Sequence, residues 1–394
     1  MPRTAEVLVV GAGMVGTAIG ARLVRAGLDV CVVDRVGPAG GTSSSGEGNI
    51  LVSDKLPGAD LALALRGLEL WREVAAVSGD SFEFEAKGGL VVAWDTAEME
   101  ALSSLAHLQE EQGVSAELVP GDRLQEIEPE LSRDLVGGVF YEQDCQVQPM
   151  LAIAAHVAEI LEYGGRVVSG VEVIGAQLDS QGSICGLRTN QGDVSVGRCV
   201  VNAAGPWAAE LARRFGASVP VEPRRGHVLV TEPVPPFVRH KIYEAGYVGS
   251  VHDEGPTWLC SSVVEATQSG TILIGSSREF VGFSARLNSE IVAATARRAV
   301  ALLPGLGAVR LMRAYVGFRP ATPDRLPIVG PDPAVQGLFH ATGHEGAGIG
   351  LSEVTAELVE ALVVGEAPAL DLAPFALDRF ASGATVPTPA PARP

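Results

Sequence analysis

The stretch EVLVVGAGMVGTAIGARLVRAGLDVCVVD, residues 6–34, decides the fold. An apolar run ends in three glycines with the spacing GxGxxG, namely Gly11, Gly13 and Gly16. An amphipathic helical pattern follows, and a second apolar run closes on the acid Asp34. This order of strand, glycine-rich turn, helix, strand and acid predicts a βαβ unit that binds a dinucleotide.

Each glycine has a physical role in such a turn. Gly11 permits the tight turn out of the strand, Gly13 lets the backbone approach a pyrophosphate, and Gly16 lets the helix pack closely on the strand. The N–H groups and the positive dipole end of the following helix face the phosphates. Asp34 is placed to accept hydrogen bonds from the ribose hydroxyls, and it disfavours a ribose with a 2′-phosphate. The motif alone leaves open whether the dinucleotide is FAD or NAD.

Length and composition narrow the class of protein. The chain has 394 residues, 47% of them hydrophobic and 19% charged, so it can bury a large core and is expected to form two domains. Its formal net charge of −18 disfavours nucleic acid and anionic membrane surfaces as partners. No apolar run approaches the roughly 18 residues of a membrane helix, so we expect a cytoplasmic protein without membrane insertion. The 5 cysteines and 7 histidines lack ligand spacing, so no disulfide framework and no metal site are expected.

The segment GPAGGTSSSGEGNILVSDK, residues 37–55, is too rich in glycine and serine for regular structure. Small side chains and hydroxyls suit a loop that wraps a polyanionic or heteroaromatic ligand, and a flexible surface loop is the alternative. The candidate contacts are Thr42, Ser43, Ser44, Gly48 and Asn49.

Two further glycine-rich turns occur later in the chain. NAAGPWAAEL, residues 202–211, places small side chains at the carboxyl end of a strand, where the backbone can approach a ligand. GHEGAGIGLS, residues 343–352, precedes a helical pattern and brings N–H groups and another positive dipole end to a ligand. An NAD-linked dehydrogenase would not need these two additional ligand-binding turns, so the sequence favours FAD over NAD.

The remaining patterns predict a second domain that is inserted twice into the first. The predicted fold class is α/β with α+β character: a Rossmann-like FAD-binding domain with a parallel sheet and a β-meander, interleaved with a substrate domain built on an antiparallel sheet plus helices. The predicted boundaries are residues 1–85, 145–215 and 319–381 for the FAD-binding domain, 86–144 and 216–318 for the substrate domain, and 382–394 for a disordered, proline-rich tail. Helices are predicted at residues 59–77, 96–111, 149–163, 288–303 and 352–364, and short strands at 82–85, 89–93 and 136–141.

Three motifs in order resemble the flavin-dependent D-amino-acid oxidase superfamily, which includes glycine oxidase and sarcosine oxidase. They are the opening stretch, VNAAGPWA in the middle, and GFRPATPDRLPIVG with ATGHEGAGIGLS near the end, so the match covers nearly the whole chain. GEGNILVSDK and PRRGHVLVTE are most similar to the β-type catalytic subunits of heteromeric opine, hydroxyproline and cyanide-forming amino-acid dehydrogenases. The resemblance implies hydride transfer from the α C–H of an amine to flavin N5, which leaves an imine that hydrolyses.

The resemblance also implies which residues hold FAD. The first turn would hold the pyrophosphate, Asp34 the ribose, Val171 the adenine, and residues 343–351 the N1 and C2 carbonyl edge of the flavin. Gly317 stands where sarcosine oxidases carry a cysteine bonded to the flavin, so noncovalent FAD is expected. The complete set is Gly11, Gly13, Val15, Gly16, Asp34, Arg35, Thr42, Ser43, Ser44, Gly48, Asn49, Val171, Ala204, Gly205, Trp207, Gly317, Gly343, Gly346, Gly348, Ile349, Gly350 and Leu351.

Arg319 matches the arginine that grips the substrate carboxylate in glycine oxidase and D-amino-acid oxidase. A planar guanidinium binds a carboxylate through two parallel hydrogen bonds, and the alternative is a structural pair with an acid such as Asp324. His344 and Glu345 are candidates to tune the proton of the amine or to line the pocket, and solvated loop residues are the alternative. The remaining candidates for substrate contact are Tyr247, Tyr243, Trp258 and Tyr315, although strand aromatics more often belong to a core, followed by Glu47 and Lys55.

The leading hypothesis is an FAD-dependent dehydrogenase or oxidase that acts on a D-amino acid, an imino acid such as D-hydroxyproline, or an opine. The alternatives are an NAD-linked dehydrogenase and a non-catalytic flavin-binding or electron-relay subunit; Arg319 argues against the relay, which has no carboxylate to hold. The likeness to β-type subunits implies an oligomer with partner subunits that carry iron–sulfur or further flavin centres. The lack of clustered cysteines fits that arrangement and a free-standing oxidase equally, so the substrate, the electron acceptor and the oligomer stay open.

Overall fold

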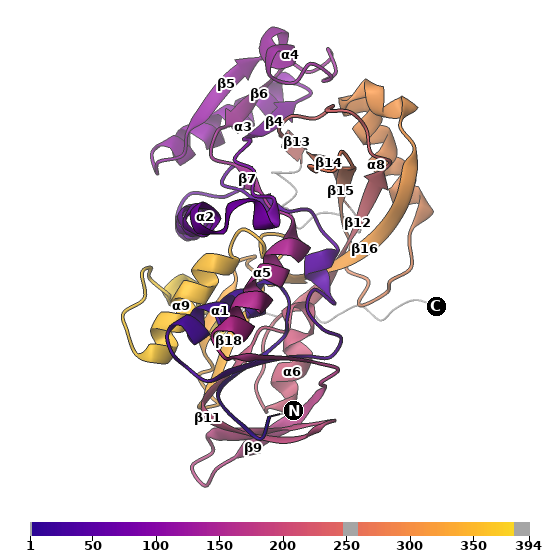
Figure 1. The fold of residues 1–394 in the computed structure, drawn as a ribbon. Coiled ribbons are helices and arrows are strands. Elements are labelled where there is room, and N and C mark those ends of the chain that lie inside the picture. Colours follow the sequence, from indigo (N-terminus) through magenta and orange to yellow (C-terminus); the bar gives the residue numbers. More distant parts are fainter. Residues whose placement is uncertain (1, 247–258, 382–394) are drawn as a thin grey trace. The chain divides into compact units, whose positions relative to one another are not determined.

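The computed structural model describes residues 2–246 and 259–381, in which the chain divides into two compact units (Figure 1). Unit 1 comprises Met1–Ser44, Pro149–Arg224 and Phe318–Pro394, and unit 2 comprises Ser45–Gln148 and Arg225–Gly317. The predicted tail at 382–394, together with Tyr247 and Trp258, lies outside the described residues.

Unit 1 is built on a mainly parallel sheet. β1 (Thr4–Val10) lies between β11 (Gly192–Asn202) and β2 (Val30–Asp34), and it is parallel to both. The strand order is β17-β18-β11-β1-β2-β8. The other strands on this path are β8 (Arg166–Ser169), β18 (Leu338–Thr342) and β17 (Ile328–Pro331), of which β17 is antiparallel to β18. Apolar runs that are buried on both faces are typical of parallel strands, and β1 and β2 have this pattern.

The β-meander continues from the same sheet. β9 (Val173–Leu178), β10 (Ile184–Thr189) and the first part of β11 pair antiparallel, with turns at Gly182 and Gly192 that have positive φ. The helices of unit 1 are α1 (Met14–Arg25), α5 (Pro149–Glu162), α6 (Ala208–Arg214) and α9 (Ser352–Val364). Because α1 packs against both α5 and α9, the helix that follows the first glycine turn is fixed on two sides.

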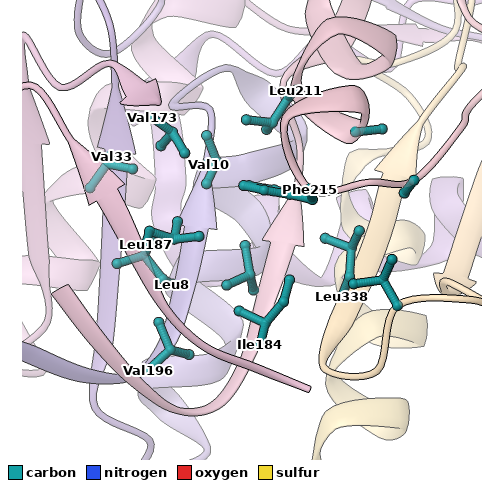
Figure 2. Packing of buried hydrophobic residues seen from close by; sticks show 14 of the residues in the cluster. Leu8, Val10, Val33, Val173, Ile184, Leu187, Val196, Leu211, Phe215 and Leu338 are labelled. Carbon is teal, nitrogen blue, oxygen red and sulfur yellow. The ribbon is translucent and has the colours of Figure 1, made fainter. Parts of the chain in front are cut away.

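A single apolar cluster joins the sheet of unit 1 to its meander (Figure 2). Leu8 and Val33 come from the parallel strands, Leu187 comes from the meander, and Phe215 follows α6. All four side chains are buried, so the strand that carries the first glycine turn is anchored by residues from distant parts of the chain.

Unit 2 is built on a second sheet, with the strand order β16-β12-β15-β14-β13-β4-β6-β5. β6 pairs antiparallel with both β4 and β5. Antiparallel pairs also join β12 to β15, β15 to β14 and β14 to β13, whereas β13 and β4 pair in parallel. The strands are β4 (Gly89–Ala93), β5 (Ala116–Pro120), β6 (Gly137–Tyr141), β12 (Glu222–Thr231), β13 (Lys241–Glu244), β14 (Leu259–Ala266), β15 (Ile272–Arg278) and β16 (Leu311–Ala321). The predicted antiparallel sheet therefore contains a parallel junction between β13 and β4.

Helices and a small ribbon complete unit 2. The helices are α2 (Ala59–Ser78), α3 (Thr96–Glu110), α4 (Leu124–Ile127) and α8 (Ser289–Leu302), and the ribbon pairs β3 (Asn49–Ile50) with β7 (Cys145–Gln146). Short 3₁₀ helices occur at Thr42–Ser44, Gly79–Phe82, Gly121–Arg123, Gly205–Trp207, Pro304–Ala308, Ala373–Phe375 and Leu377–Phe380. In the part of the chain that the structure describes, no helix is long and apolar enough to cross a membrane.

Two local features differ from the sequence analysis. Unit 2 begins at Ser45 rather than at residue 86, because β3 pairs with β7 and Val147 N donates to Gly48 O at 3.0 Å. The strand predicted at 82–85 is wrong: the 3₁₀ helix there ends at Phe82, whose ring packs edge-on against Trp71 with 5.8 Å between the ring centroids. A large apolar side chain before a polar loop can belong to a strand or to a 3₁₀ helix that buries it, and the sequence alone does not distinguish the two.

Candidate functional site

The first glycine turn brings backbone segments so close together that a side chain at Gly11 or Gly16 would clash with them. Gly11 has φ +118°, and a Cβ atom there would lie 2.3 Å from Ala203 O. A Cβ atom at Gly16 would lie 1.9 Å from Gly11 O. The first and third glycines therefore allow the turn, the start of α1 and the end of β11 to touch through their backbones.

The hydroxyl-rich segment lies at the N-terminus of α1. Met14 N donates to Ser43 Oγ at 3.0 Å, and a Cβ atom at Gly13 would lie 3.1 Å from the same oxygen. Thr42 Oγ1 donates to Phe318 O at 2.6 Å, and Ser44 Oγ donates to Gly41 O. Ser43 is thus the hydroxyl at the helix end where a phosphate is expected, and Val15 lies in the first turn of α1.

Asp34 ends β2 and is fixed by backbone donors. Its Oδ2 accepts from Ala12 N at 2.9 Å, while its Oδ1 accepts from Val36 N at 2.7 Å and from Gly37 N at 2.9 Å. Its carbonyl accepts from Val171 N at 2.9 Å. The carboxylate is therefore oriented before any ligand binds, and Val171 is joined to the same strand end.

A cleft opens beside this carboxylate, and six of the predicted cofactor residues line it. The Arg35 guanidinium lies over the Trp207 ring, 5.4 Å from its centroid, and both residues belong to the lining. The complete lining is Val10, Gly11, Val33, Asp34, Arg35, Val36, Gly40, Gly41, Val171, Glu172, Val173, Ala204, Trp207, Glu210, Leu211 and Arg214. An adenosine diphosphate moiety requires a carboxylate for its ribose hydroxyls, a cation and an aromatic ring, and glycine backbone that its phosphates can approach. The cleft offers all of these, so the adenosine half of the dinucleotide fits it.

Three charged residues of this cleft were missed by the sequence analysis. Arg214 Nη2 lies 3.0 Å from Glu172 Oε1 and 2.8 Å from Glu210 Oε1. The spacing of Glu210 and Arg214, four residues apart on a helix that follows a ligand-binding turn, was a signal for such a pair. The sequence gave no such signal for Glu172, because its contact with Arg214 depends on how the β-meander folds back toward α6.

A buried polar network holds the second turn. Asn202 Nδ2 donates to Ala208 O at 3.0 Å and lies 3.3 Å from His340 Nδ1, while His340 Nε2 lies 2.9 Å from Asp332 Oδ2. Burial opposes the ionisation of Asp332, but hydrogen bonds from His340 and from two backbone N–H groups outweigh it, so the pKa of Asp332 lies below its usual value. Thr342 Oγ1 also donates to Gly205 O at 3.0 Å, which ties the turn to β18.

The third turn, residues 343–351, carries its predicted glycines, Ile349 and Leu351 directly before α9. Glu345 N donates to Pro320 O at 2.9 Å, so this turn is attached to the end of β16. A Cβ atom at Gly346 would lie 3.4 Å from Arg319 Nε. The predicted carboxylate clamp and the predicted flavin-edge turn therefore meet within unit 1.

His344 and Glu345 point to different partners. His344 is buried, with Nε2 2.9 Å from Thr355 Oγ1 of α9, and burial lowers its pKa to about 4. Glu345 Oε1 lies 3.1 Å from Arg224 Nη1, and both side chains are buried. His344 thus braces the turn against α9, whereas Glu345 is a carboxylate in the segment that meets Arg319.

Asp324, the acid considered as a structural partner of Arg319, forms a two-point pair with Arg379. The distances are 2.7 Å from Arg379 Nε to Asp324 Oδ2 and 3.1 Å from Nη2 to Oδ1.

A second buried pair, which the sequence analysis missed, connects the helices around α1. His156 Nε2 of α5 lies 3.1 Å from Glu353 Oε1 of α9, and His156 Nδ1 lies 3.3 Å from Thr17 Oγ1 of α1. Burial raises the pKa of Glu353, but His156 together with Arg25 and Arg22 outweighs this effect, and the pKa is lowered. His156 of α5 thereby bridges α1 and α9, the helices that begin at the first and third turns.

Several predicted residues lie in unit 2. A Cβ atom at Gly48 would lie 1.7 Å from Val147 O, so the backbone of Val147 already requires a glycine there. A Cβ atom at Gly317 would lie 2.6 Å from Ser45 O, so a cysteine at this position needs the backbone to move. Asn49 pairs with Gln146 in the small ribbon.

The weaker substrate candidates also belong to unit 2. Tyr243 is buried, burial and Glu47 raise the pKa of Tyr315 to about 12, and Lys55 Nζ lies 3.2 Å from Asp54 Oδ1. Among the described residues, no group of three or more His, Cys, Asp or Glu side chains could hold a metal ion.

These features together are those of an FAD-binding oxidoreductase with a Rossmann-like domain: the first glycine turn, the cleft at Asp34, the β-meander and the two later turns. The chain belongs to the DAO family of FAD dependent oxidoreductases, whose model matches residues 6–362. FAD is thus its cofactor and the NAD alternative is wrong, and the predicted superfamily, fold class and enzyme class are confirmed.

Relatives of known name span nearly the full length of the chain. Hydrogen cyanide synthase subunit HcnC of Pseudomonas aeruginosa is 29% identical, over 96% of this chain and 97% of the relative. Glycine oxidase of Geobacillus kaustophilus is 31% identical, over 95% of this chain and 97% of the relative. The crystal structure of glycine oxidase from Geobacillus kaustophilus superposes with a TM-score of 0.87, over 96% of this chain and 99% of that structure, at 27% identity. The predicted oxidation of a CH–NH bond fits these relatives.

Proposed function

We propose that the protein oxidises the CH–NH bond of an amino acid or imino acid and that Arg319 holds the substrate carboxylate. The observation that carries this proposal is the approach of Arg319 to Gly346, which joins the expected carboxylate clamp to the expected flavin-edge turn. The relatives named glycine oxidase and the D-amino acid dehydrogenase of Methylobacterium nodulans, 27% identical over 92% of this chain, support the substrate class.

FAD would be held by the first turn, by Ser43 at the N-terminus of α1, by Asp34 and its cleft, and by residues 343–351. When bound, FAD supplies the hydride acceptor for the α C–H bond. The N–H groups of Glu345, Gly346, Ala347 and Leu351 already donate within the protein, so the donors for negative charge at the flavin edge would come from residues 348–350. The turn that carries them is braced by His344.

The chain itself supplies orientation and charge. The guanidinium of Arg319 is planar and binds a carboxylate through two parallel hydrogen bonds, so it fixes the direction in which the substrate Cα points. Glu345 directly precedes Gly346, and because its carboxylate is paired with Arg224 the two side chains add no net charge to the turn. His344 is neutral near pH 7 because its pKa is lowered to about 4, so it adds no charge.

An anaerobic screen of amines tests the proposal: the correct amino or imino acid bleaches the flavin absorbance without oxygen. Arg319→Ala is expected to retain FAD and to lower kcat/KM by about a hundredfold or more, because two charge-assisted hydrogen bonds are lost. Arg379→Ala is a matched control, since this arginine pairs with Asp324. Unchanged kcat/KM in Arg319→Ala contradicts the clamp, and no bleaching by any amine favours the electron-relay alternative.

We further propose that the protein works as an oligomer in the cytoplasm and passes electrons to partner subunits with iron–sulfur or flavin centres. The relative named as a subunit of hydrogen cyanide synthase supports this arrangement. Slow reoxidation of the reduced flavin by oxygen and fast reoxidation by an artificial acceptor would support it. Fast turnover of the isolated chain with oxygen would instead identify a free-standing oxidase.

A further inference from the structure

Two segments of unit 1 form facing walls of the cleft at Asp34. The first wall is residues 171–173, where the chain enters β9, and the second wall is α6. The helix α6 packs against β9 (Figure 1). Glu172 and Val173 of the first wall line the cleft, as do Glu210 and Arg214 of the second. These two walls come from segments that are separated in the chain by most of the β-meander.

The guanidinium group of Arg214 contacts both walls at once. Its Nη1 lies 3.0 Å from Glu172 Oε1 and also donates to the carbonyl oxygen of Val173. Its Nη2 lies 3.0 Å from the same oxygen of Glu172 and 2.8 Å from Glu210 Oε1. One cation therefore joins a carboxylate and a backbone carbonyl of the first wall to a carboxylate of the second.

The geometry of these contacts requires an arginine. Its N–H groups form a rigid, planar fork, so Glu172, Val173 and Glu210 can be held together in one arrangement. A pair between Glu210 and Arg214 alone would be an ordinary ion pair on the surface of a helix. The contacts with the first wall go beyond such a pair, because they connect α6 to the β-meander.

Apolar side chains line the cleft between the walls. Val173 and Leu211 come from the two walls, and Val10 and Val33 come from β1 and β2. All four also belong to the apolar cluster of unit 1 (Figure 2). A purine base buries its apolar faces against side chains of this kind. The separation of the two walls therefore decides how closely the adenine of FAD can be held.

We propose that Arg214 is a positioning residue that fixes the width of this cleft for the adenosine half of FAD. Because the walls are held before the cofactor binds, less conformational freedom is lost on binding. The three charged side chains are partly exposed, so the same contacts are expected to contribute little to the stability of the flavin-free protein. The inference rests on the assignment of the cleft to adenosine and not on the oxidation of an amine, so it is tested without a substrate.

Two ligands that each represent one half of FAD provide the test. ADP carries the adenosine and the diphosphate without the flavin, and FMN carries the flavin without the adenosine. Each is titrated into the flavin-free protein in a calorimeter. Arg214→Met keeps an unbranched side chain and loses the fork, and it is expected to raise the Kd of ADP by about tenfold or more. The Kd of FMN is expected to be the same in the variant and the wild type.

Arg379→Met is the matched control. Arg379 also joins a carboxylate, that of Asp324, to backbone carbonyl groups of unit 1, but it does not belong to the cleft lining. We expect this control to leave the Kd of ADP unchanged. In urea unfolding of the flavin-free protein, the midpoint of Arg214→Met should fall no further than that of the control. Arg214→Lys is a milder variant, since it keeps the charge without the fork, and it should raise the Kd of ADP by about threefold or more.

The outcomes separate positioning from a structural role. A Kd of ADP that Arg214→Met leaves within about twofold of the wild-type value overturns the inference. Equal losses of affinity for ADP and FMN also overturn it and assign Arg214 a structural role. If Arg214→Met does not fold, an unchanged Kd of ADP in Arg214→Lys overturns the inference by itself. Failure of the wild type to bind ADP overturns the assignment of the cleft, and the inference with it, whereas the amine screen decides the proposed function separately.

Discussion

His344 makes the stability of the flavin-free protein depend on pH. Its imidazole is buried and makes a hydrogen bond of 2.9 Å with the hydroxyl of Thr355, and burial lowers its pKa from 6.5 to about 4. Between these two values the unfolded chain binds a proton at this residue and the folded chain does not. Stability from this group is therefore complete above the unfolded pKa and falls as the pH drops toward 4.

The size of the effect follows from the shift. One pKa unit corresponds to about 1.4 kcal/mol, so acidification from pH 7 to pH 5 should remove about 2 kcal/mol of unfolding free energy through His344. Asp144 of unit 2 acts in the opposite direction, because burial raises its pKa from 3.8 to about 7 and ionisation is costly above that pH. A pH profile of the wild type alone therefore mixes two opposed contributions.

The assay compares the wild type with His344→Gln in the flavin-free form. Urea unfolding is followed by circular dichroism at pH 7 and pH 5, and the loss of unfolding free energy is compared between the two proteins. We expect the variant to lose about 2 kcal/mol less than the wild type, because glutamine does not titrate. Equal losses would mean that the imidazole gains no proton on unfolding, and the burial argument for His344 would be refuted.

Three further perturbations follow from close contacts and buried charges. Gly16→Ala should weaken FAD binding by about tenfold or more, since its Cβ would lie 1.9 Å from Gly11 O, whereas Gly46→Ala, with open space around it, should leave flavin fluorescence titrations unchanged. Gly317→Cys should lower unfolding free energy by about 1–3 kcal/mol and still release its flavin on acid precipitation; a yellow pellet would contradict this. Lys241→Met should cost about 3–5 kcal/mol in urea unfolding because it strands buried Glu265, and the double variant with Glu265→Gln should recover most of that loss.

The features that were predictable from the sequence are those that depend on residues within one short segment. The first βαβ unit follows from glycine spacing between two apolar runs, and helix Ser352–Val364 follows from its glycine-rich start and apolar period. Asp34 was predictable as the acid that ends the second strand beside the glycine turn, where it lines the cleft; its contact with the cofactor stays a prediction. In each case the deciding contacts join residues within one turn or one βαβ unit.

The features that were missed depend on partners far away in the sequence. Arg224 meets Glu345 across more than a hundred residues, and no periodicity in either segment reveals the other. The parallel pairing of β13 with β4 was missed for the same reason, because the apolar pattern of a strand does not show which strand lies beside it in the sheet. Gly48 was assigned to the cofactor from its loop, although the backbone of Val147 already demands a glycine there; whether it also touches FAD stays a prediction.

The pairing of β1 with β11 has a consequence for how the protein is made. Val10 pairs with Asn202, 192 residues later (202 minus 10). At about 5–20 residues per second, the ribosome needs roughly 10–40 s to deliver that partner after β1 has emerged. During this interval an apolar strand edge is exposed to other nascent chains. Slow, cool expression with ample chaperone should therefore raise the yield of soluble protein more than any change at the surface of the finished fold.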